Sequence, residues 1–154
     1  MKVLVMSDSH GANNSMLAVV EKETPDYILH LGDYDRDCAA IRLAFPDIPL
    51  RAVRGNCDFG SNELEIDEFV LNGKRFLMTH GHLFGVKSSI SRIKQHAENR
   101  DIDILLFGHT HVSHYEVCEG GLHVINPGSM CFGSSKSYAV IEISNEKIEC
   151  ELRR

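Results

Sequence analysis

The sequence lacks any long apolar run and any run of basic residues. A helix that spans a bilayer needs about 20 apolar residues, and no stretch approaches that length, so we expect no membrane span. The apolar run after Lys2 is also too short for a secretory signal, which favours a cytoplasmic protein. With a formal net charge of -6 and no basic stripe, we expect it to bind neither a nucleic-acid polymer nor an anionic membrane surface.

Cysteines are few and scattered. The five are odd in number and never spaced as C-x-x-C, at Cys38, Cys57, Cys118, Cys131 and Cys150. This pattern indicates reduced thiols rather than a disulfide framework or a thiolate metal cluster. Linkers, repeats and low-complexity segments are absent as well. The 154 residues, 43% hydrophobic and 25% charged, are therefore expected to form a single domain over residues 1–154.

Buried strands and amphipathic helices alternate in the first third of the chain. Apolar runs predict strands at 3–6, 27–31 and 50–53, with helices from Ser15 to just before Pro25 and at 37–45. A strand, a helix and a second strand in this order form a right-handed parallel unit. The beginning of the chain is therefore expected to build a parallel sheet.

Hairpin signals follow in the remaining two thirds. Strands at 69–71 and 75–79 flank the turn Asn72-Gly73, and a helix at 88–99 precedes a buried strand at 102–107. The remainder is predicted as a β meander with strands at 112–118, 122–125, 138–143 and 147–152, the last pair turning around Asn145. The predicted fold class is α/β, a four-layer α/β/β/α sandwich of two mixed sheets flanked by helices.

Side chains that can bind a metal follow five of the predicted strands. In chain order they are Asp8, His10, Asp33, Asn56, His80, His109 and His111. Ligands in open α/β sheets bind outside the carboxyl ends of the strands, so these side chains could converge in one crevice. Oxygen and imidazole ligands suit a divalent transition metal. One structural zinc needs four ligands, so seven indicate two metal ions with a shared bridging group.

Each of these residues also has a simpler explanation. Asp33 could cap a helix or a turn, Asn56 is typical of turns, and His80 could be a buried core histidine. His109 and His111 are stronger candidates, because alternate positions on a strand or its exit place both rings on one side. The joint occurrence at strand ends favours one site over separate explanations.

In order and spacing, the motifs D-x-H, G-D, G-N, H and G-H-T-H resemble the calcineurin-like metallophosphoesterase superfamily. The compact length, G-N-C-D at 55–58 and N-P-G-S at 126–129 are most similar to its small bacterial and archaeal phosphodiesterase branch. The resemblance covers essentially the whole chain. It implies a metallo-dependent phosphatase-like fold and a hydrolase that acts on the ester bond of a small phosphoester, as a phosphodiesterase.

The resemblance also implies a ligand set and a mechanism. One metal ion would be held by Asp8, His10 and His111, the other by Asn56, His80 and His109, with Asp33 bridging. The family often uses manganese, and iron, zinc or nickel are alternatives. Two cations about 3.5 to 4 Å apart would lower the pKa of a bridging water, so that a hydroxide attacks phosphorus in line. The cations would also explain how an acidic protein binds an anion.

One position departs from the family pattern. Many members have a histidine directly after G-N that is thought to protonate the leaving group, whereas this chain has Cys57 followed by Asp58. A general acid contributes about 10² to 10⁴-fold to the rate. Asp58 could replace it, or could instead orient a ligating histidine. Cys57 is expected to pack, although nearby cations could lower its pKa and make it oxidisable.

Two other functions remain open on the sequence. The first is a non-catalytic protein-interaction scaffold resembling the retromer scaffold subunit, and the second is regulatory nucleotide binding without turnover. The scaffold lacks some metal-binding histidines, whereas every position is filled here, which favours the enzyme. The short chain has no evident cap domain, so we expect an open pocket whose missing walls could come from a homo-oligomer.

Overall fold

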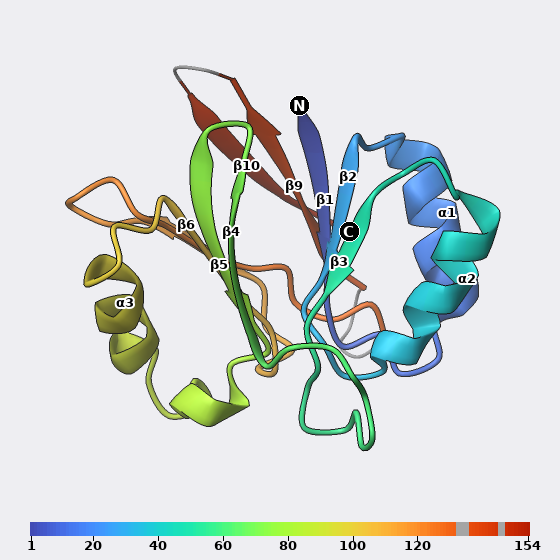
Figure 1. Ribbon diagram of the computed structural model, residues 1–154, viewed down its shortest axis with the longest axis horizontal. Helices are drawn as coiled ribbons and strands as arrows, with labels where there is room; N and C mark the ends of the chain where they lie inside the picture. The colour runs from blue at the N-terminus through green and yellow to red at the C-terminus, as the bar shows by residue number, and fades with distance from the viewer. Residues whose placement is uncertain (132–135, 145–146) are drawn as a thin grey trace.

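In the computed structural model, residues 1–131, 136–144 and 147–154 are described, and they include two five-stranded sheets that face each other (Figure 1). Helices α1 (Asn13–Glu23) and α2 (Cys38–Ala44) lie on one side of the pair of sheets. Helix α3 (Ser91–Glu98) lies on the other side. The predicted four-layer α/β/β/α architecture is therefore confirmed. No helix in the described part of the chain has the length and apolar character to cross a membrane.

The first sheet contains the N-terminal strands and the last two strands of the chain. Its order is β10-β9-β1-β2-β3, with β1 (Lys2–Met6), β2 (Tyr27–His30), β3 (Leu50–Ala52), β9 (Tyr138–Ile143) and β10 (Ile148–Arg153). Strands β1, β2 and β3 are parallel, as predicted, and β9 pairs antiparallel with β1. Because β1, β2 and β3 are parallel, their carboxyl ends lie at the same edge of the sheet. The short helix η1 (Asp35–Asp37) follows β2 and leads into α2.

The second sheet is built from the middle of the chain. Its order is β4-β5-β6-β8-β7, with β4 (Ile66–Leu71), β5 (Lys74–Thr79), β6 (Ile104–Phe107), β7 (His114–Val117) and β8 (His123–Asn126). The β4–β5 hairpin turns at Asn72 and Gly73, which both have positive φ (49° and 77°), as a tight two-residue turn requires. Helix η2 (His82–Phe84) follows β5.

The β meander predicted for the end of the chain is wrong as one continuous unit, although its two pairs of neighbouring strands are found. β7 and β8 pair antiparallel, and so do β9 and β10, but β8 also pairs in parallel with β6, and β9 and β10 belong to the other sheet. Apolar patterning reports which face of a strand is buried, but partners distant in sequence decide which sheet the strand joins. Helix boundaries also differ slightly, since α3 begins at Ser91 instead of Ser88. The turn predicted around Asn145 lies outside the described residues.

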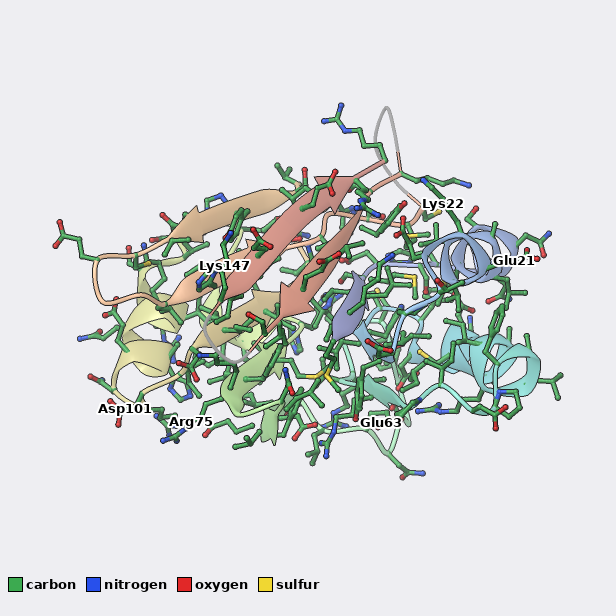
Figure 2. The ribbon with its side chains drawn as sticks, turned by 90° about the horizontal axis from the view of Figure 1, so that it is seen from above. Glu21, Lys22, Glu63, Arg75, Asp101 and Lys147 are labelled. Carbon is green, nitrogen blue, oxygen red and sulfur yellow. The ribbon has the colours of Figure 1, made fainter. Side chains whose placement is uncertain are left out.

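Strand β1 shows how the sequence builds the layers. Val3 and Val5 point into the core between the two sheets, whereas Leu4 and Met6 pack beneath α1 and α2. All four side chains are fully buried, which explains why the strand reads as an unbroken apolar run. Viewed from above, apolar side chains fill the space between layers, and charged residues such as Glu21 and Arg75 lie outside (Figure 2). The buried strand fixes the position of the residues that follow it.

Candidate metal centre

The loops that leave β1, β2, β5 and β6 meet at the edge between the two sheets. Within the first sheet, the Asp8 N–H donates to the Gly32 carbonyl at 3.0 Å. Within the second, the Gly108 N–H donates to the His80 carbonyl at 3.1 Å. The two sheets are also joined directly, because Nδ1 of His80 lies 2.8 Å from the carbonyl oxygen of Leu31. The carboxyl ends of strands from both sheets therefore surround one site.

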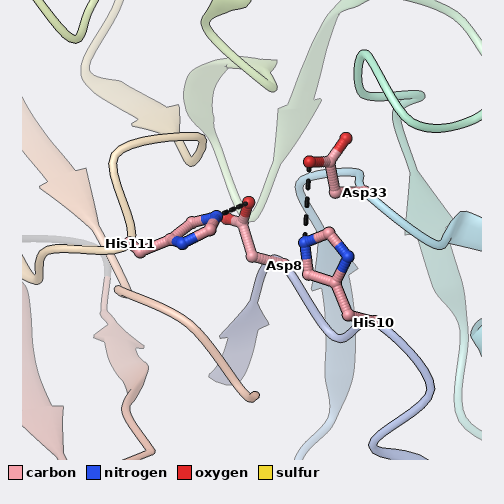
Figure 3. Close-up of side chains that lie close together, drawn as sticks. All are labelled: Asp8, His10, Asp33 and His111. Carbon is pink, nitrogen blue, oxygen red and sulfur yellow. Dashed lines mark ion pairs between the residues drawn. The ribbon is translucent and has the colours of Figure 1, made fainter. Parts of the chain in front are cut away.

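A first group of potential metal ligands lies at the ends of β1, β2 and β6. One ligand atom from each of Asp8, His10, Asp33 and His111 lies within 4.8 Å of the others (Figure 3). Nε2 of His111 is 3.0 Å from Oδ1 of Asp8, and Nε2 of His10 is 3.7 Å from Oδ2 of Asp33. Two carboxylates and two imidazoles at these separations match the donor chemistry of a divalent transition metal.

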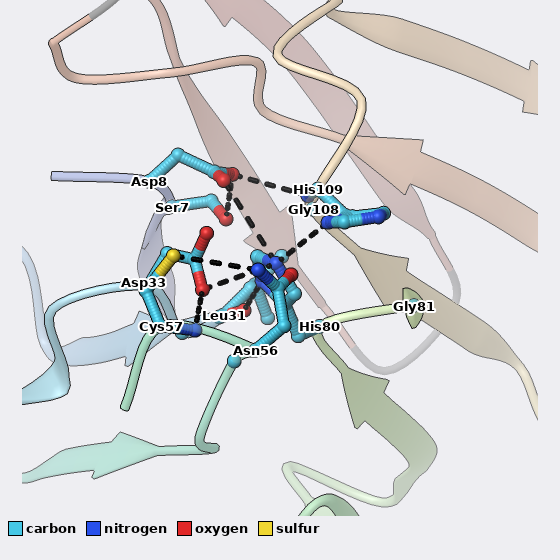
Figure 4. Close-up of polar contacts among 12 residues, drawn as sticks. Ser7, Asp8, Leu31, Asp33, Asn56, Cys57, His80, Gly81, Gly108 and His109 are labelled. Atoms are coloured by element: carbon cyan, nitrogen blue, oxygen red, sulfur yellow. Dashed lines mark hydrogen bonds and ion pairs between the residues drawn. The ribbon is translucent and has the colours of Figure 1, made fainter. Parts of the chain in front are cut away.

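A second group contains Asp33, His80 and His109, whose ligand atoms also lie within 4.8 Å of one another. Nε2 of His80 lies 3.1 Å from Nδ1 of His109 and 3.4 Å from Oδ1 of Asp33 (Figure 4). Asp33 thus belongs to both groups. Its Oδ1 faces His80, whereas its Oδ2 faces His10. A carboxylate in this position can serve two ions at once.

Asn56 lies just beyond β3 and is exposed to solvent. Its side-chain amide donates to Sγ of Cys57 at 3.3 Å, and the Cys57 N–H donates to Oδ1 of Asp33 at 2.9 Å (Figure 4). Asn56 is therefore next to the oxygen of Asp33 that faces the second group. All seven predicted residues are thus found at one edge of the sheets.

The predicted alternation of side chains along strands does not hold at the site. β1 ends at Met6 and β6 at Phe107, so His109 and His111 lie in a turn and join different groups. Five of the seven residues have left-handed φ between 42° and 67°, namely Asp8, His10, Asp33, His109 and His111. This conformation costs about 1 to 3 kcal/mol for a residue other than glycine. Such strain persists where surrounding contacts impose it, and it is typical of functional sites.

Two glycines next to the predicted ligands allow the strand ends to approach closely. A Cβ on Gly55 would lie 2.2 Å from Oδ1 of Asp33, and a Cβ on Gly108 would lie 2.0 Å from Oγ of Ser7. Distances below 3.0 Å require neighbouring atoms to move. The glycines of the G-N and G-H-T-H motifs therefore make room for the carboxylates, a role that motif spacing alone did not reveal.

The Asp8 carboxylate is fully buried, and its two oxygens have different surroundings. Oδ2 accepts hydrogen bonds from Oγ of Ser7 (2.5 Å) and from the His109 N–H (3.1 Å). Oδ1 accepts no hydrogen bond among the described residues and faces the ring nitrogens of His111 and, at 4.0 Å, His80. Burial raises the pKa of Asp8, against the lowering effect of His80. A cation would offset the cost of burying this charge, so the residues fit a metal ion.

Protonation in the second group follows from its charges. Burial alone would raise the pKa of Asp33, but its hydrogen bond and ion pair with His80 hold it well below its usual range. For His80, burial would lower the pKa, yet Asp33 and Asp8 outweigh that effect and raise it. Burial and the nearby His80 lower the pKa of His109 to about 4. Asp33 is therefore an ionised carboxylate and His109 a neutral imidazole, the forms in which these side chains bind metals, whereas His80 would have to lose its proton when a cation binds.

Asp58 ties together two of the loops that carry predicted ligands. Its Oδ1 accepts hydrogen bonds from the N–H groups of Tyr34 (2.6 Å) and Asp35 (3.0 Å). Its Oδ2 accepts one from the Gly55 N–H at 2.7 Å. Backbone donors from both loops therefore engage both oxygens of this carboxylate. The geometry supports a positioning role for Asp58.

A deeper hydrogen-bond network supports the first group. Oδ2 of Asp37 accepts hydrogen bonds from Oγ of Ser9 (2.8 Å) and the Gly11 N–H (2.7 Å), and Nε2 of His30 lies 3.2 Å from Oγ of Ser9. Burial lowers the pKa of His30 to about 4, so its ring is neutral. The sequence did not single out His30, although a histidine within a buried apolar strand is a signal that could have revealed it.

Cys57 occupies the position of the family's missing histidine. Its thiol is free and exposed. The other four cysteines are also free thiols, with Cys38 buried and Cys118, Cys131 and Cys150 partly buried. Desolvation of its sulfur and the neighbouring Asp33 carboxylate raise the pKa of Cys57 to about 11. The prediction that Cys57 packs is wrong, because its side chain is exposed. The lowering of its pKa by bound cations stays a prediction.

Known proteins resemble this chain over nearly its whole length. The calcineurin-like phosphoesterase superfamily domain matches residues 1–146. The probable metallophosphoesterase YsnB of Bacillus subtilis is 32% identical over 95% of this chain and 86% of its own. The phosphodiesterase YfcE of Escherichia coli K12 is 28% identical, over 92% and 88% of the two chains.

A solved structure shows the same fold. Wild-type Vps29 of Entamoeba histolytica, complexed with zinc, superimposes with a TM-score of 0.78 over 99% of this chain and 98% of its own. Its sequence identity is only 19%, so this similarity concerns the fold alone. Together with the family match, the relatives assign the enzyme class. The chain belongs to the calcineurin-like phosphoesterase superfamily and is a hydrolase of phosphoester bonds.

Proposed function

We propose that this chain is a phosphodiesterase that hydrolyses a small phosphoester with two divalent cations, and that residues 1–154 act as one domain. The observation that carries the proposal is the position of Asp33, whose two oxygens face different groups of potential ligands. When bound, the cations would lower the pKa of a water molecule and take up charge on the phosphoryl oxygens. Manganese is the metal we propose, with zinc, iron or nickel as alternatives.

The assignment of ligands follows the two groups. Asp8, His10 and His111 would hold one cation, His80 and His109 the other, and Asp33 both. Asn56, next to the Asp33 oxygen that faces His80, would complete the second set. The contact between Asp8 Oδ2 and the His109 N–H supports this arrangement, because it leaves Oδ1 directed toward His111. Ligands fixed in this way need little reorganisation when the cations bind.

Asp58 would act by positioning. Its three backbone hydrogen bonds hold the loop after β2 against the loop after β3, and these loops carry Asp33 and Asn56. Without a proton donor at this position, turnover would depend on how well the leaving group carries negative charge. We therefore expect aryl esters to react faster than alkyl esters.

A non-catalytic scaffold is the alternative function. The complete set of seven ligand-type residues favours the enzyme, because a protein that works only through contacts does not need them. The likeness to Vps29 extends to the fold and carries no argument for a scaffold.

The experiment is hydrolysis of bis-p-nitrophenyl phosphate with and without added Mn²⁺. We expect metal-dependent turnover by the wild type and a loss of at least about 100-fold in Asp33→Ala and His80→Ala. Asp47→Ala is the matched control, since Asp47 is exposed on the loop that precedes β3. Absence of metal-dependent hydrolysis by the wild type, or full activity in both site variants, would overturn the proposal.

A further inference from the structure

An open cavity of about 330 Å³ adjoins the second group of potential ligands. Its lining includes Arg54, Asn56, Phe59, Glu65 and His82. Asn56 belongs to the proposed metal site, and the ring of His82 lies 5.5 Å from that of His80, measured between centroids. A phosphoryl group bound at the metal site would therefore have its ester group within reach of this cavity.

Phe59 is the most unusual side chain of the cavity. It is 94% exposed, although an isolated phenyl ring is normally buried in a protein of this kind. The ring stands on the loop between β3 and β4, directly after Asp58. Its exposure leaves an aromatic face available to a bound molecule.

Contacts on both sides of Phe59 hold this loop in place. Asp58 accepts three backbone hydrogen bonds, Oγ of Ser61 hydrogen-bonds to Asp35, and Glu63 forms an ion pair of 3.2 Å with Arg42. The loop therefore presents the ring from an anchored base. An anchored aromatic ring loses little conformational entropy when a ligand stacks on it.

Polar groups around the cavity complement the ring. Arg54 and Glu65 form an ion pair of 3.1 Å in which both side chains stay about 40% exposed. Nδ1 of His82 is buried and has no hydrogen-bond partner among the described residues. An apolar face together with a few polar groups is typical of a small-molecule site, and about 300 Å³ is the lower end of the usual size.

We propose that this cavity binds the organic group of the phosphoester, and that Phe59 stacks on a planar aromatic ring, an aryl group or a nucleobase. The inference rests on the proposed function, because the metal site must hold the phosphoryl group. A flat ring gains more from an aromatic partner than a methyl group does, since it offers a whole face for contact. The cavity thus selects esters of aromatic alcohols or of nucleosides over small alkyl esters.

The test compares the affinity of Mn²⁺-loaded protein for phenylphosphonate and methylphosphonate by titration calorimetry. We expect the wild type to bind phenylphosphonate about five-fold more tightly than methylphosphonate. In Phe59→Ala this ratio should fall to about one. Leu43→Ala is the matched control, because Leu43 is 85% exposed on α2 and does not line the cavity, and it should keep the wild-type ratio.

Equal affinity of the wild type for both phosphonates, or an unchanged ratio in Phe59→Ala, would overturn the cavity proposal and leave the proposed function standing. If neither phosphonate binds in a metal-dependent manner, both proposals fall. Thermal melting of Phe59→Ala should match that of the wild type, because the ring contributes little buried area.

Discussion

The carboxylate of Asp8 accepts a hydrogen bond of 3.1 Å from the backbone N–H of His109, 101 residues further along the chain. The contact joins the end of β1 in one sheet to the end of β6 in the other. Because the Ser7 hydroxyl donates to the same oxygen, the second oxygen of Asp8 is left to face His111. The orientation of one proposed ligand thus depends on how closely the two sheets approach.

Gly108→Ala should disturb this contact. The added Cβ would lie 2.0 Å from Oγ of Ser7 and 3.0 Å from Oδ2 of Asp8, so the Asp8 carboxylate would have to move. We expect metal affinity and phosphodiester hydrolysis to fall by about 10 to 100-fold, as when a group that orients a metal ligand is lost. Gly120→Ala is the control, since nothing lies within 4 Å of its Cβ position. Equal activity of the two variants would contradict this account.

Asp58→Asn distinguishes positioning from proton donation. Asparagine offers one acceptor oxygen, so at least one of the three backbone hydrogen bonds is lost, at a cost of about 1 to 3 kcal/mol of unfolding free energy. We expect lower activity on every phosphoester, with the same pH profile as the wild type. Urea denaturation and the pH dependence of kcat measure the two effects.

A general acid at Asp58 would give a different result. Asp58→Asn would then lose the high-pH limb of the rate profile, and substrates with poor leaving groups would suffer far more than aryl esters. That outcome would contradict the positioning role.

Glu23 holds the end of the chain through a buried charge cluster remote from the site. Its side chain is 2% exposed and forms ion pairs with Lys2 (2.8 Å) and Arg153 (2.5 Å), and the Tyr138 hydroxyl donates to it at 2.8 Å. Burial alone would raise the pKa of Glu23, but these three partners lower it from 4.5 to about 2.

The lowered pKa of Glu23 predicts a pH-dependent stability. Its contribution is fully present above pH 4.5, the ordinary pKa, and is lost as the pH falls toward 2. The shift corresponds to about 3 kcal/mol at most. Glu23→Gln should therefore lose stability at pH 7 and show a smaller further loss between pH 5 and pH 3 than the wild type does. Urea denaturation of both proteins at pH 5 and pH 3 measures the unfolding free energy. The prediction is wrong if this free energy falls by the same amount in the variant and the wild type.

Local sequence signals were enough to predict the layers and the edge at which the site lies. Val3, Leu4, Val5 and Met6 are apolar because both faces of β1 are buried, and Asn72-Gly73 marks the hairpin through its left-handed turn. Polar residues at the ends of parallel strands must meet at one edge, whatever the details of the loops. The candidate residues therefore follow from topology and residue type.

Contacts between distant segments account for what could not be predicted. β9 joins the first sheet because it pairs with β1, which lies more than 130 residues earlier in the chain. Lys2 of β1, for example, pairs with Glu142 of β9. The left-handed conformation of His109 and the role of Gly108 depend on Ser7 and Asp8 in the other sheet. The pattern of residue types within one short segment does not show which distant segments that segment contacts.

The binding stoichiometry of Mn²⁺, measured by equilibrium dialysis, tests the two-cation site most directly. We predict two ions per chain for the wild type and about one for Asp8→Ala, because Asp8 belongs to the first group only. The melting curve of Asp8→Ala should show that the fold is largely retained. A wild type that binds no Mn²⁺, or an Asp8→Ala variant that still binds two ions with wild-type affinity, would contradict the account.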